Sequence, residues 1–211
     1  MKYCTLIILC MLFSCGNKED ILLPKAASTI VKDVNDLSPI YIFFRVNGKD
    51  TLAEVNRKNS IISTNWILNI DKRLPLRLVI PEVMKLQKKK KQRKKNEEKA
   101  HKNEKAENYY SYADTIGKNL AFIPFTNVFY KMGKPIGTVI YFNKKNEITV
   151  YNNGIKKEDL KNYLLELKGK SKEVSFCFDK EMSYGGYIQN KIFIESLIPS
   201  KANMVENEFV F

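Results

Sequence analysis

The stretch Gly137-Thr-Val-Ile-Tyr-Phe-Asn-Lys-Lys-Asn-Glu-Ile-Thr-Val-Tyr151 decides the fold of this 211-residue chain. Its two ends, 137–142 and 147–151, are rich in β-branched and aromatic residues, and residues 143–146 between them are all Asn or Lys. Two such runs around a polar turn predict a pair of neighbouring strands. We expect Asn153-Gly154 to turn the chain again after the second strand.

The residues that follow predict two helices and two more strands. Leu160, Tyr163, Leu164 and Leu167 are spaced as i, i+3, i+4 and i+7, which is typical of an amphipathic helix packed along one stripe. Residues 173–179 predict a third strand, Ser183 can cap a second helix, and 205–211 predict a last strand. The order strand-strand-helix-strand-helix-strand predicts an α+β domain over 119–211, with one small sheet and helices on one face.

The N-terminal part, 39–81, is expected to be rich in strands. Residues 40–46 and 50–55 flank Asn47-Gly48, a dipeptide typical of a tight hairpin turn. The apolar run 61–70 contains the only tryptophan, Trp66, and we expect 76–80 to form another strand before Pro81.

A basic segment, 82–113, separates the two parts. Pro81 followed by Glu82 suits the first turn of a helix. Between Lys85 and Glu107 the chain has eleven Lys or Arg and four Glu, a net charge of +7 out of +13 for the whole chain. Because only Ala100 and Ala106 are apolar from Lys88 to Asn108, this stretch offers little to bury. It is a long projecting basic helix, an insertion between strands, or disordered.

The basic segment has two interpretations that remain open. It is either a solvated insertion or a contact for an anionic partner, such as an acidic cell-wall polymer, a lipid phosphate or an anionic membrane surface. Nucleic acid is not expected, because no aromatic residue between Lys85 and Asn108 could stack on bases. The candidate contact residues are Lys88, Lys89, Lys90, Lys91, Arg93, Lys94 and Lys95.

The first residues have the parts of an export signal. Lys2 is followed by an apolar run, 4–13, whose helical length of roughly 15 Å is about half of a bilayer core. Leu12-Phe13-Ser14-Cys15 resembles the lipobox of bacterial lipoproteins. The resemblance implies that residues 1–14 are removed, that Cys15 carries a lipid, and that 15–38 tether the fold to a membrane of the cell envelope.

Two other interpretations of the amino-terminal end stay open: a plain signal peptide and a buried apolar strand. The sequence Lys18-Glu19-Asp20 also resembles the signal that sends some Bacteroidetes lipoproteins to the cell surface, although a solvated linker would look the same.

The sequence offers few groups for catalysis. The single histidine, His101, has no second metal ligand nearby, and no glycine-rich phosphate loop is present. Cys177 is the one cysteine after Cys15 and is expected to be a buried strand thiol, so no disulfide is expected. We therefore expect a protein that is not an enzyme and that uses no metal or cofactor. Asp179, at a strand end, is expected to be a turn or capping residue.

Part of the chain resembles a known family. The segments 139–150, 157–160 and 174–179, followed by Asp179-Lys-Glu-Met-Ser-Tyr184-Gly185, resemble the periplasmic domain of ExbD/TolR biopolymer-transport proteins over about residues 137–198. The resemblance implies a β-β-α-β-α-β domain that docks with other envelope transport proteins or forms a homodimer, and it marks Asp179, Tyr184 and Gly185 as interaction candidates.

The chain departs from that family in its membrane segment. The family has a transmembrane helix with a buried aspartate, whereas residues 4–13 contain no acidic residue. We therefore expect a membrane-anchored, non-catalytic binding or scaffolding subunit without proton coupling. The alternative is a surface-exposed lipoprotein that binds glycan or an anionic ligand and has no link to transport.

An internal similarity joins the two parts of the chain. Residues 69–76, Asn-Ile-Asp-Lys-Arg-Leu-Pro-Leu, resemble 177–184, Cys-Phe-Asp-Lys-Glu-Met-Ser-Tyr. Either the chain contains two copies of one unit, the first interrupted by the basic segment, or two strand ends agree by chance.

Overall fold

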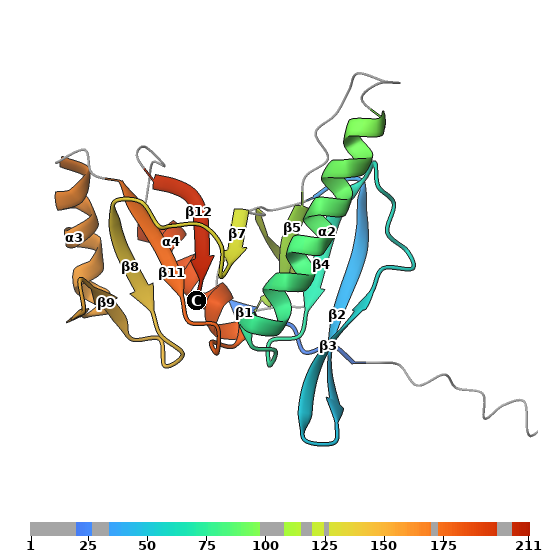
Figure 1. Ribbon diagram of the computed structural model, residues 1–211, viewed down its shortest axis with the longest axis horizontal. Coiled ribbons are helices and arrows are strands. Elements are labelled where there is room, and N and C mark those ends of the chain that lie inside the picture. The colour runs from blue at the N-terminus through green and yellow to red at the C-terminus, as the bar shows by residue number, and fades with distance from the viewer. Residues whose placement is uncertain are drawn as a thin grey trace, which may run out of the picture.

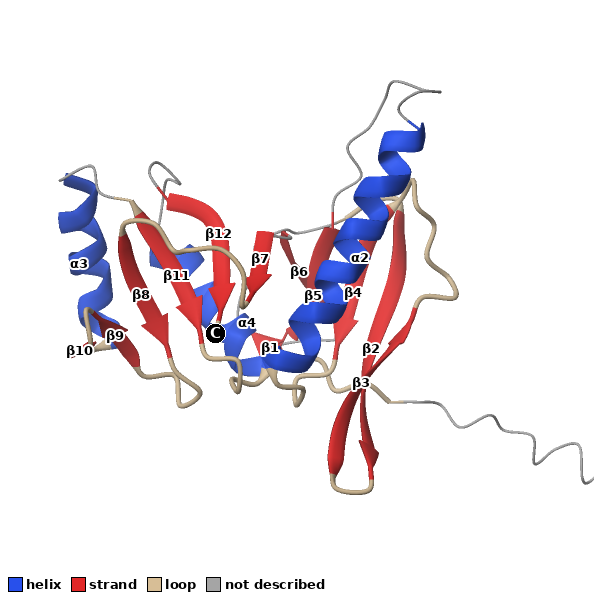
Figure 2. Ribbon diagram, in the orientation of Figure 1, coloured by secondary structure: helices blue, strands red, loops and turns tan. Residues whose placement is uncertain are grey.

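The computed structural model describes residues 20–26, 34–97, 108–114, 120–124, 127–169, 173–197 and 204–211. Within these residues the chain forms two six-stranded sheets and three helices (Figures 1 and 2). The expected α+β class is confirmed.

The first sheet is built from the N-terminal half and has the order β1-β5-β4-β2-β3. Strand β6, outside this order, pairs antiparallel with β5 over residues 109–113. Strand β2 is antiparallel to β3 and parallel to β4, and β4 is parallel to β5. Helix α2 connects β4 to β5. The bounds are β1 (Lys25–Ala26), β2 (Leu37–Asn47), β3 (Asp50–Asn56), β4 (Asn65–Ile70), α2 (Leu76–Glu97), β5 (Asn108–Asp114) and β6 (Leu120–Pro124).

The second sheet has the order β10-β9-β8-β11-β12-β7. Strand β8 is antiparallel to β9 and parallel to β11, and β11 is parallel to β12. Helix α4 connects β11 to β12. The bounds are β7 (Asn127–Tyr130), β8 (Thr138–Phe142), β9 (Ile148–Val150), β10 (Asn153–Ile155), α3 (Lys157–Gly169), β11 (Val174–Phe178), α4 (Tyr184–Leu197) and β12 (Met204–Val210).

The two halves repeat one arrangement. In each half the chain enters through an edge strand (β1 or β7), forms an antiparallel pair, adds a parallel strand, crosses through a helix, and returns as a strand between the earlier strands. The second half has α3 and β10 in addition, and the first half has β6. This shared order is what the two-copy interpretation of the internal similarity predicts.

The repeated units meet at the turns that precede α2 and α4. Leu76 N donates to Met182 O at 2.9 Å, and Tyr184 N donates to Leu74 O at 2.7 Å. A second pair of bonds runs from Arg77 N to Lys180 O at 2.8 Å and from Gly185 N to Lys72 O at 3.0 Å. Equivalent residues of the two turns are 108 positions apart, so the contact is symmetric about an axis between Pro75 and Ser183, which form an isolated bridge.

These bonds also explain how the two helices begin. The first N–H groups of a helix have no partner inside the helix and need one elsewhere. Here the carbonyl groups of the opposite unit accept them, and Ser183 Oγ accepts from Gly186 N at 3.1 Å. The expected cap at Ser183 is confirmed.

One hydrophobic core runs through both sheets. It joins side chains of the first sheet, such as Ile40 and Leu68, to side chains of the second, such as Phe142 and Phe178. Leu74 and Met182, at equivalent positions of the two turns, are fully buried between them. Since a contiguous core normally marks one domain, the two units form a single body.

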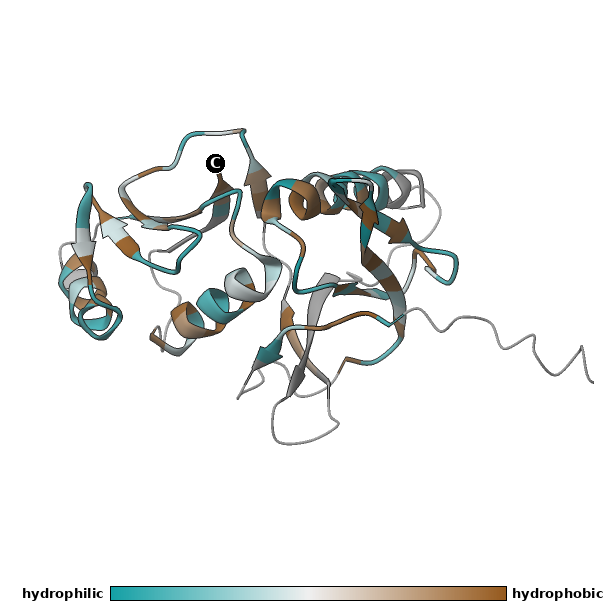
Figure 3. Cartoon of the chain, turned by 90° about the horizontal axis from the view of Figure 1, so that it is seen from below, coloured by the Kyte–Doolittle hydropathy of each residue, from teal (hydrophilic) through white to brown (hydrophobic). Residues whose placement is uncertain are grey.

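Helices α2 and α4 lie on opposite faces of this body (Figure 3). The amphipathic helix expected from Leu160, Tyr163, Leu164 and Leu167 is present as α3, and the three leucines of its stripe are buried.

Several expectations are wrong in detail. Residues 76–80 are the first turns of α2 and not a strand, because Leu76, Val79, Ile80 and Val83 share one buried helical face. Pro81 consequently lies inside the helix and not at its start.

The expected boundary between the halves is also displaced. Strand β6, at 120–124, belongs to the first sheet, so the second unit begins with β7 and not at residue 119. The turn expected at Asn153-Gly154 occurs two residues earlier, where Tyr151 and Asn152 have positive φ, and Asn153–Ile155 is strand β10. Residues 22–26 of the expected tether pair with the body through β1 and Leu22.

Candidate functional site

The turn residue Asp179 organises the approach to α4. Its Oδ1 accepts a bond from Glu181 N at 2.8 Å and its Oδ2 accepts one from Lys144 N at 3.2 Å. The pKa of Tyr141 is raised, first by burial and then by the neighbouring Asp179 carboxylate. Asp179 therefore does what a turn residue is expected to do.

Tyr184 and Gly185, the other family-motif candidates, lie in the contact between the units. The Tyr184 side chain is fully buried. A Cβ on Gly185 would lie 3.2 Å from Lys72 Cβ and 3.3 Å from Lys72 O, so the glycine permits the close approach of the opposite turn. Tyr184 and Gly185 therefore lie at the joint between the two units, whereas the side-chain bonds of the half-buried Asp179 stay within the second unit.

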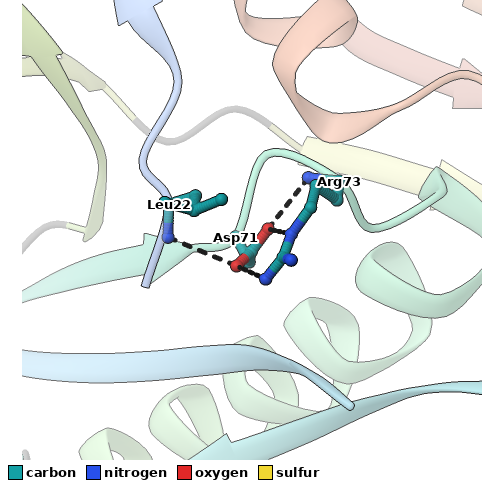
Figure 4. A network of polar contacts seen from close by, with 3 residues as sticks. All are labelled: Leu22, Asp71 and Arg73. Carbon is teal, nitrogen blue, oxygen red and sulfur yellow. Dashed lines mark hydrogen bonds and ion pairs between the residues drawn. The ribbon is translucent and has the colours of Figure 1, made fainter. Parts of the chain in front are cut away.

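The equivalent turn of the first unit is built around Asp71 (Figure 4). Its carboxylate, 1% exposed, accepts from Arg73 N at 3.0 Å, Arg73 Nε at 2.9 Å, Arg73 Nη2 at 2.8 Å and Leu22 N at 3.2 Å. Burial alone raises the pKa of Asp71, but the bonds from Arg73 and Leu22 outweigh it, so the pKa is lower than usual. The Arg73 guanidinium also lies 4.4 Å from the centre of the Phe44 ring. Asp71 thus fastens the segment before β1 to the turn.

Helix α2 carries the cationic candidates, and they do not all face the same way. The Lys90 side chain is 3% exposed, its Nζ donates to Thr64 O at 3.1 Å, and it lies 4.7 Å from the centre of the Trp66 ring. Lys90 therefore packs inward and is no part of an exposed cationic surface. Lys88 and Lys91 are exposed, and Lys89 is half-buried. Arg93, Lys94 and Lys95 lie in α2, but their side chains are outside the described part of the structure.

The exposed lysines border a groove between α2 and β7. The groove has a volume of about 690 Å³. Met84 lies on the helix wall, and Phe129, Tyr130 and Met132 form the opposite wall. The charged residues that line the described groove are all lysines, namely Lys85, Lys88 and Lys91.

The charges at this groove are nearly all of one sign. Lys85 is held by Glu82 at 2.6 Å. Lys88 and Lys91 make no ion pair with any acidic side chain that the structure describes. A fourth cation, Lys131, adds to the rim, because its Nζ lies 5.3 Å from the centre of the Tyr130 ring. The site therefore combines apolar walls with a positive edge.

The equivalent helix of the second unit lacks this character. The positions of α4 that correspond to Lys85 and Lys88 are Phe193 and Ser196, given the offset of 108. The lysine of α4, Lys191, is 2% exposed and pairs with Glu208 at 2.6 Å, while Glu208 also accepts a bond from the Tyr187 hydroxyl. The positive charge of the groove thus comes from α2 and is not repeated on α4.

Groups for covalent or metal chemistry are not gathered at the groove. Cys177 is buried in β11, and burial raises the pKa of its thiol to about 12, so it stays protonated. Among the residues with described positions, no group of three or more His, Cys, Asp or Glu could hold a metal ion. His101 lies outside the described residues.

The residues expected to anchor the chain in a membrane also lie outside the described residues. The signal-like segment, 1–14, and Cys15 are not described. Within the described ranges, no helix is long and apolar enough to cross a membrane.

Sequence reasoning located one wall of the groove and missed the other. The density of lysine identified 88–91, but Phe129, Tyr130 and Met132 carry no motif. Their role depends on β7 being an edge strand beside α2, which is a long-range property of the fold.

No protein-family model matches this chain, and comparison with curated proteins and with solved structures gives no significant match.

Proposed function

We propose that this chain is a lipid-anchored protein of the bacterial cell envelope that acts by binding and not by catalysis. The observation that carries the proposal is the groove between α2 and β7, where Lys88 and Lys91 stand exposed beside apolar walls. The partner that such an edge attracts is anionic: a lipid surface or an acidic cell-wall polymer.

The lipid anchor rests on Leu12-Phe13-Ser14-Cys15. We expect a Cys15→Ala variant to leave the membrane fraction, and mass spectrometry of the unsubstituted protein to show an acylated Cys15 as its first residue. An uncleaved and unmodified amino terminus would contradict the anchor, as would retention of the variant in membranes.

A relation to ExbD/TolR proteins is the finer part of the proposal. It is supported by the order β8-β9-α3-β11-α4-β12, in which the short strand β10 is added after β9, and by Asp179, Tyr184 and Gly185 at the turn into α4. Since Tyr184 and Gly185 join two units within one chain, we propose that the fold is a scaffold in an envelope assembly, without proton coupling. Crosslinking in intact cells should recover integral transport components, and recovery of none at native expression would contradict this relation.

The second candidate is a surface lipoprotein that binds an anionic ligand without any link to transport. The groove favours it as well, because an apolar pocket with a positive edge needs no transport partner. Protease treatment of whole cells separates the candidates, since it digests a surface protein and spares a periplasmic one.

The anionic partner is tested with vesicles. Replacing Lys88 and Lys91 with Gln should weaken binding to vesicles rich in anionic phospholipid by about 2 kcal/mol, roughly 30-fold, because each surface lysine contributes about 1 kcal/mol. The vesicle affinity of this double variant should also depend less on salt concentration. Lys144 and Lys145, an exposed pair on the turn after β8, provide the matched control. Equal losses in both double variants would show that only net charge matters.

A further inference from the structure

We propose that the groove between α2 and β7 binds the acyl chain of an anionic lipid, with the lipid's negative headgroup held by Lys88 and Lys91. The inference rests on the anionic partner of the proposed function. It identifies that partner as a lipid and the groove as the place where its acyl chain binds.

The size and lining of the groove fit such a ligand. Ligand sites of about 300–1,000 Å³ with mostly apolar walls and few polar groups are typical of small-molecule binding, and this groove has about 690 Å³. Met84 and Met132 stand on opposite sides of it. Methionine side chains adapt to flexible apolar ligands, because they are unbranched and polarisable.

The exposure of Met132 also supports binding of an acyl chain. Its side chain is 57% exposed in the loop after β7, although it lies at the edge of an apolar groove. An acyl chain in the groove would cover that surface and would gain free energy in proportion to the apolar area removed from water.

The positions of the charges orient the ligand. Lys88 and Lys91 are three residues apart on α2, so their side chains emerge on one side of the helix. Neither has an acidic partner within the described part of the chain. Along the helix wall Lys88 and Lys91 follow Pro81 and Met84, so these cations lie toward the C-terminal end of α2. An apolar groove with such cations, and with no carboxylate among its described lining residues, is complementary to an amphiphile with a single negative end.

An acidic peptide is the competing occupant, and the walls favour it less. A peptide held beside a strand gains affinity through main-chain hydrogen bonds. Helix α2 satisfies most of its backbone bonds internally, so only the edge strand β7 could pair with a peptide backbone. The side chains between them are mostly apolar, with lysines and two glutamines, and suit an acyl chain with a charged end better.

The test uses the purified full-length protein and palmitic acid that carries a photoreactive diazirine. We expect crosslinks to map to peptides that contain Met84 or residues 129–132, and unlabelled palmitate to compete better than the uncharged alcohol of equal length. Labelling spread over other peptides would overturn the inference, as would displacement by oligoglutamate but not by palmitate.

A matched pair of variants separates binding in the groove from nonspecific hydrophobic binding elsewhere on the surface. Met132→Glu places a carboxylate in the groove and should reduce labelling at least about tenfold, because an ionised group is costly to bury against an acyl chain. Ile61→Glu changes a residue of nearly equal exposure, 58%, outside the groove lining and should label like the unsubstituted protein. Circular dichroism and thermal unfolding of both variants establish that they are folded.

The inference and the proposed function fail in different experiments. Salt-dependent vesicle binding through Lys88 and Lys91 without labelling of the groove would overturn this inference alone. Labelling of the groove without any salt-dependent vesicle binding would overturn the anionic-surface proposal alone.

Discussion

At the scale of the residue, Asp71 shows most clearly how one side chain orders distant segments. Its carboxylate binds Arg73 two residues later and Leu22 far away in the chain. Because the pKa of Asp71 is lowered in the fold, its ionised form stabilises the protein. That contribution is complete above the unfolded-state value of 3.8 and is lost as the pH falls through the lower folded-state pKa.

Asp71→Asn should therefore destabilise the protein by about 2 kcal/mol near neutral pH, since hydrogen bonds to charged groups contribute that much. Urea unfolding of both proteins should give a constant difference from about pH 7 to about pH 5 and a narrowing one below about pH 4. Asp50→Asn, at the exposed start of β3, controls for the loss of one negative charge. A difference that grows on acidification would contradict the assignment.

At the scale of the element, α2 changes its role along its length. Its first turns bury Leu76, Val79 and Val83, and the buried stripe continues through Leu86 to Lys90. Lys90 can lie on that buried stripe because its aliphatic stem is apolar, while its Nζ donates to Thr64 O and lies over the Trp66 ring.

Lys90→Ala should consequently cost about 1–2 kcal/mol of stability, because it removes a charge-assisted hydrogen bond and a shielded cation–π contact. Lys91→Ala, one position further and exposed, should change stability by less than about 0.5 kcal/mol. Chemical unfolding measures both, and the fluorescence of Trp66 should change only in the Lys90 variant. Equal effects of the two substitutions would place Lys90 at the surface.

Several elements could be predicted from sequence because their signals are local. The β2–β3 hairpin has Asn47-Gly48 at its turn, α3 has a regular apolar stripe, and α4 has Ser183 as its cap. The prediction of a strand at 76–80 was wrong because a short apolar segment suits a strand and a buried helix equally. The helical spacing of its apolar residues is clear only when Val83 and Leu86 are included.

At the scale of the whole molecule, the missing information was which strand pairs with which. Nothing local separates 120–124 from 127–130, yet the first joins one sheet and the second joins the other. The groove was hidden for the same reason, since it exists only where β7 comes beside α2. By contrast, the similarity between 69–76 and 177–184 carried real information, because these turns are the contact between the two units.

That contact is the central claim of this account: two repeated units hold each other by bonds from the first turns of α2 and α4. Hydrogen exchange of the intact protein tests it directly. Amides in the first turn of a helix normally lack partners and exchange fast. We predict that the N–H groups of Leu76, Arg77, Tyr184 and Gly185 exchange as slowly as those of β4 and β11. Exchange of these four amides as fast as that of Asn59, in an exposed loop, would contradict the joined pair of units.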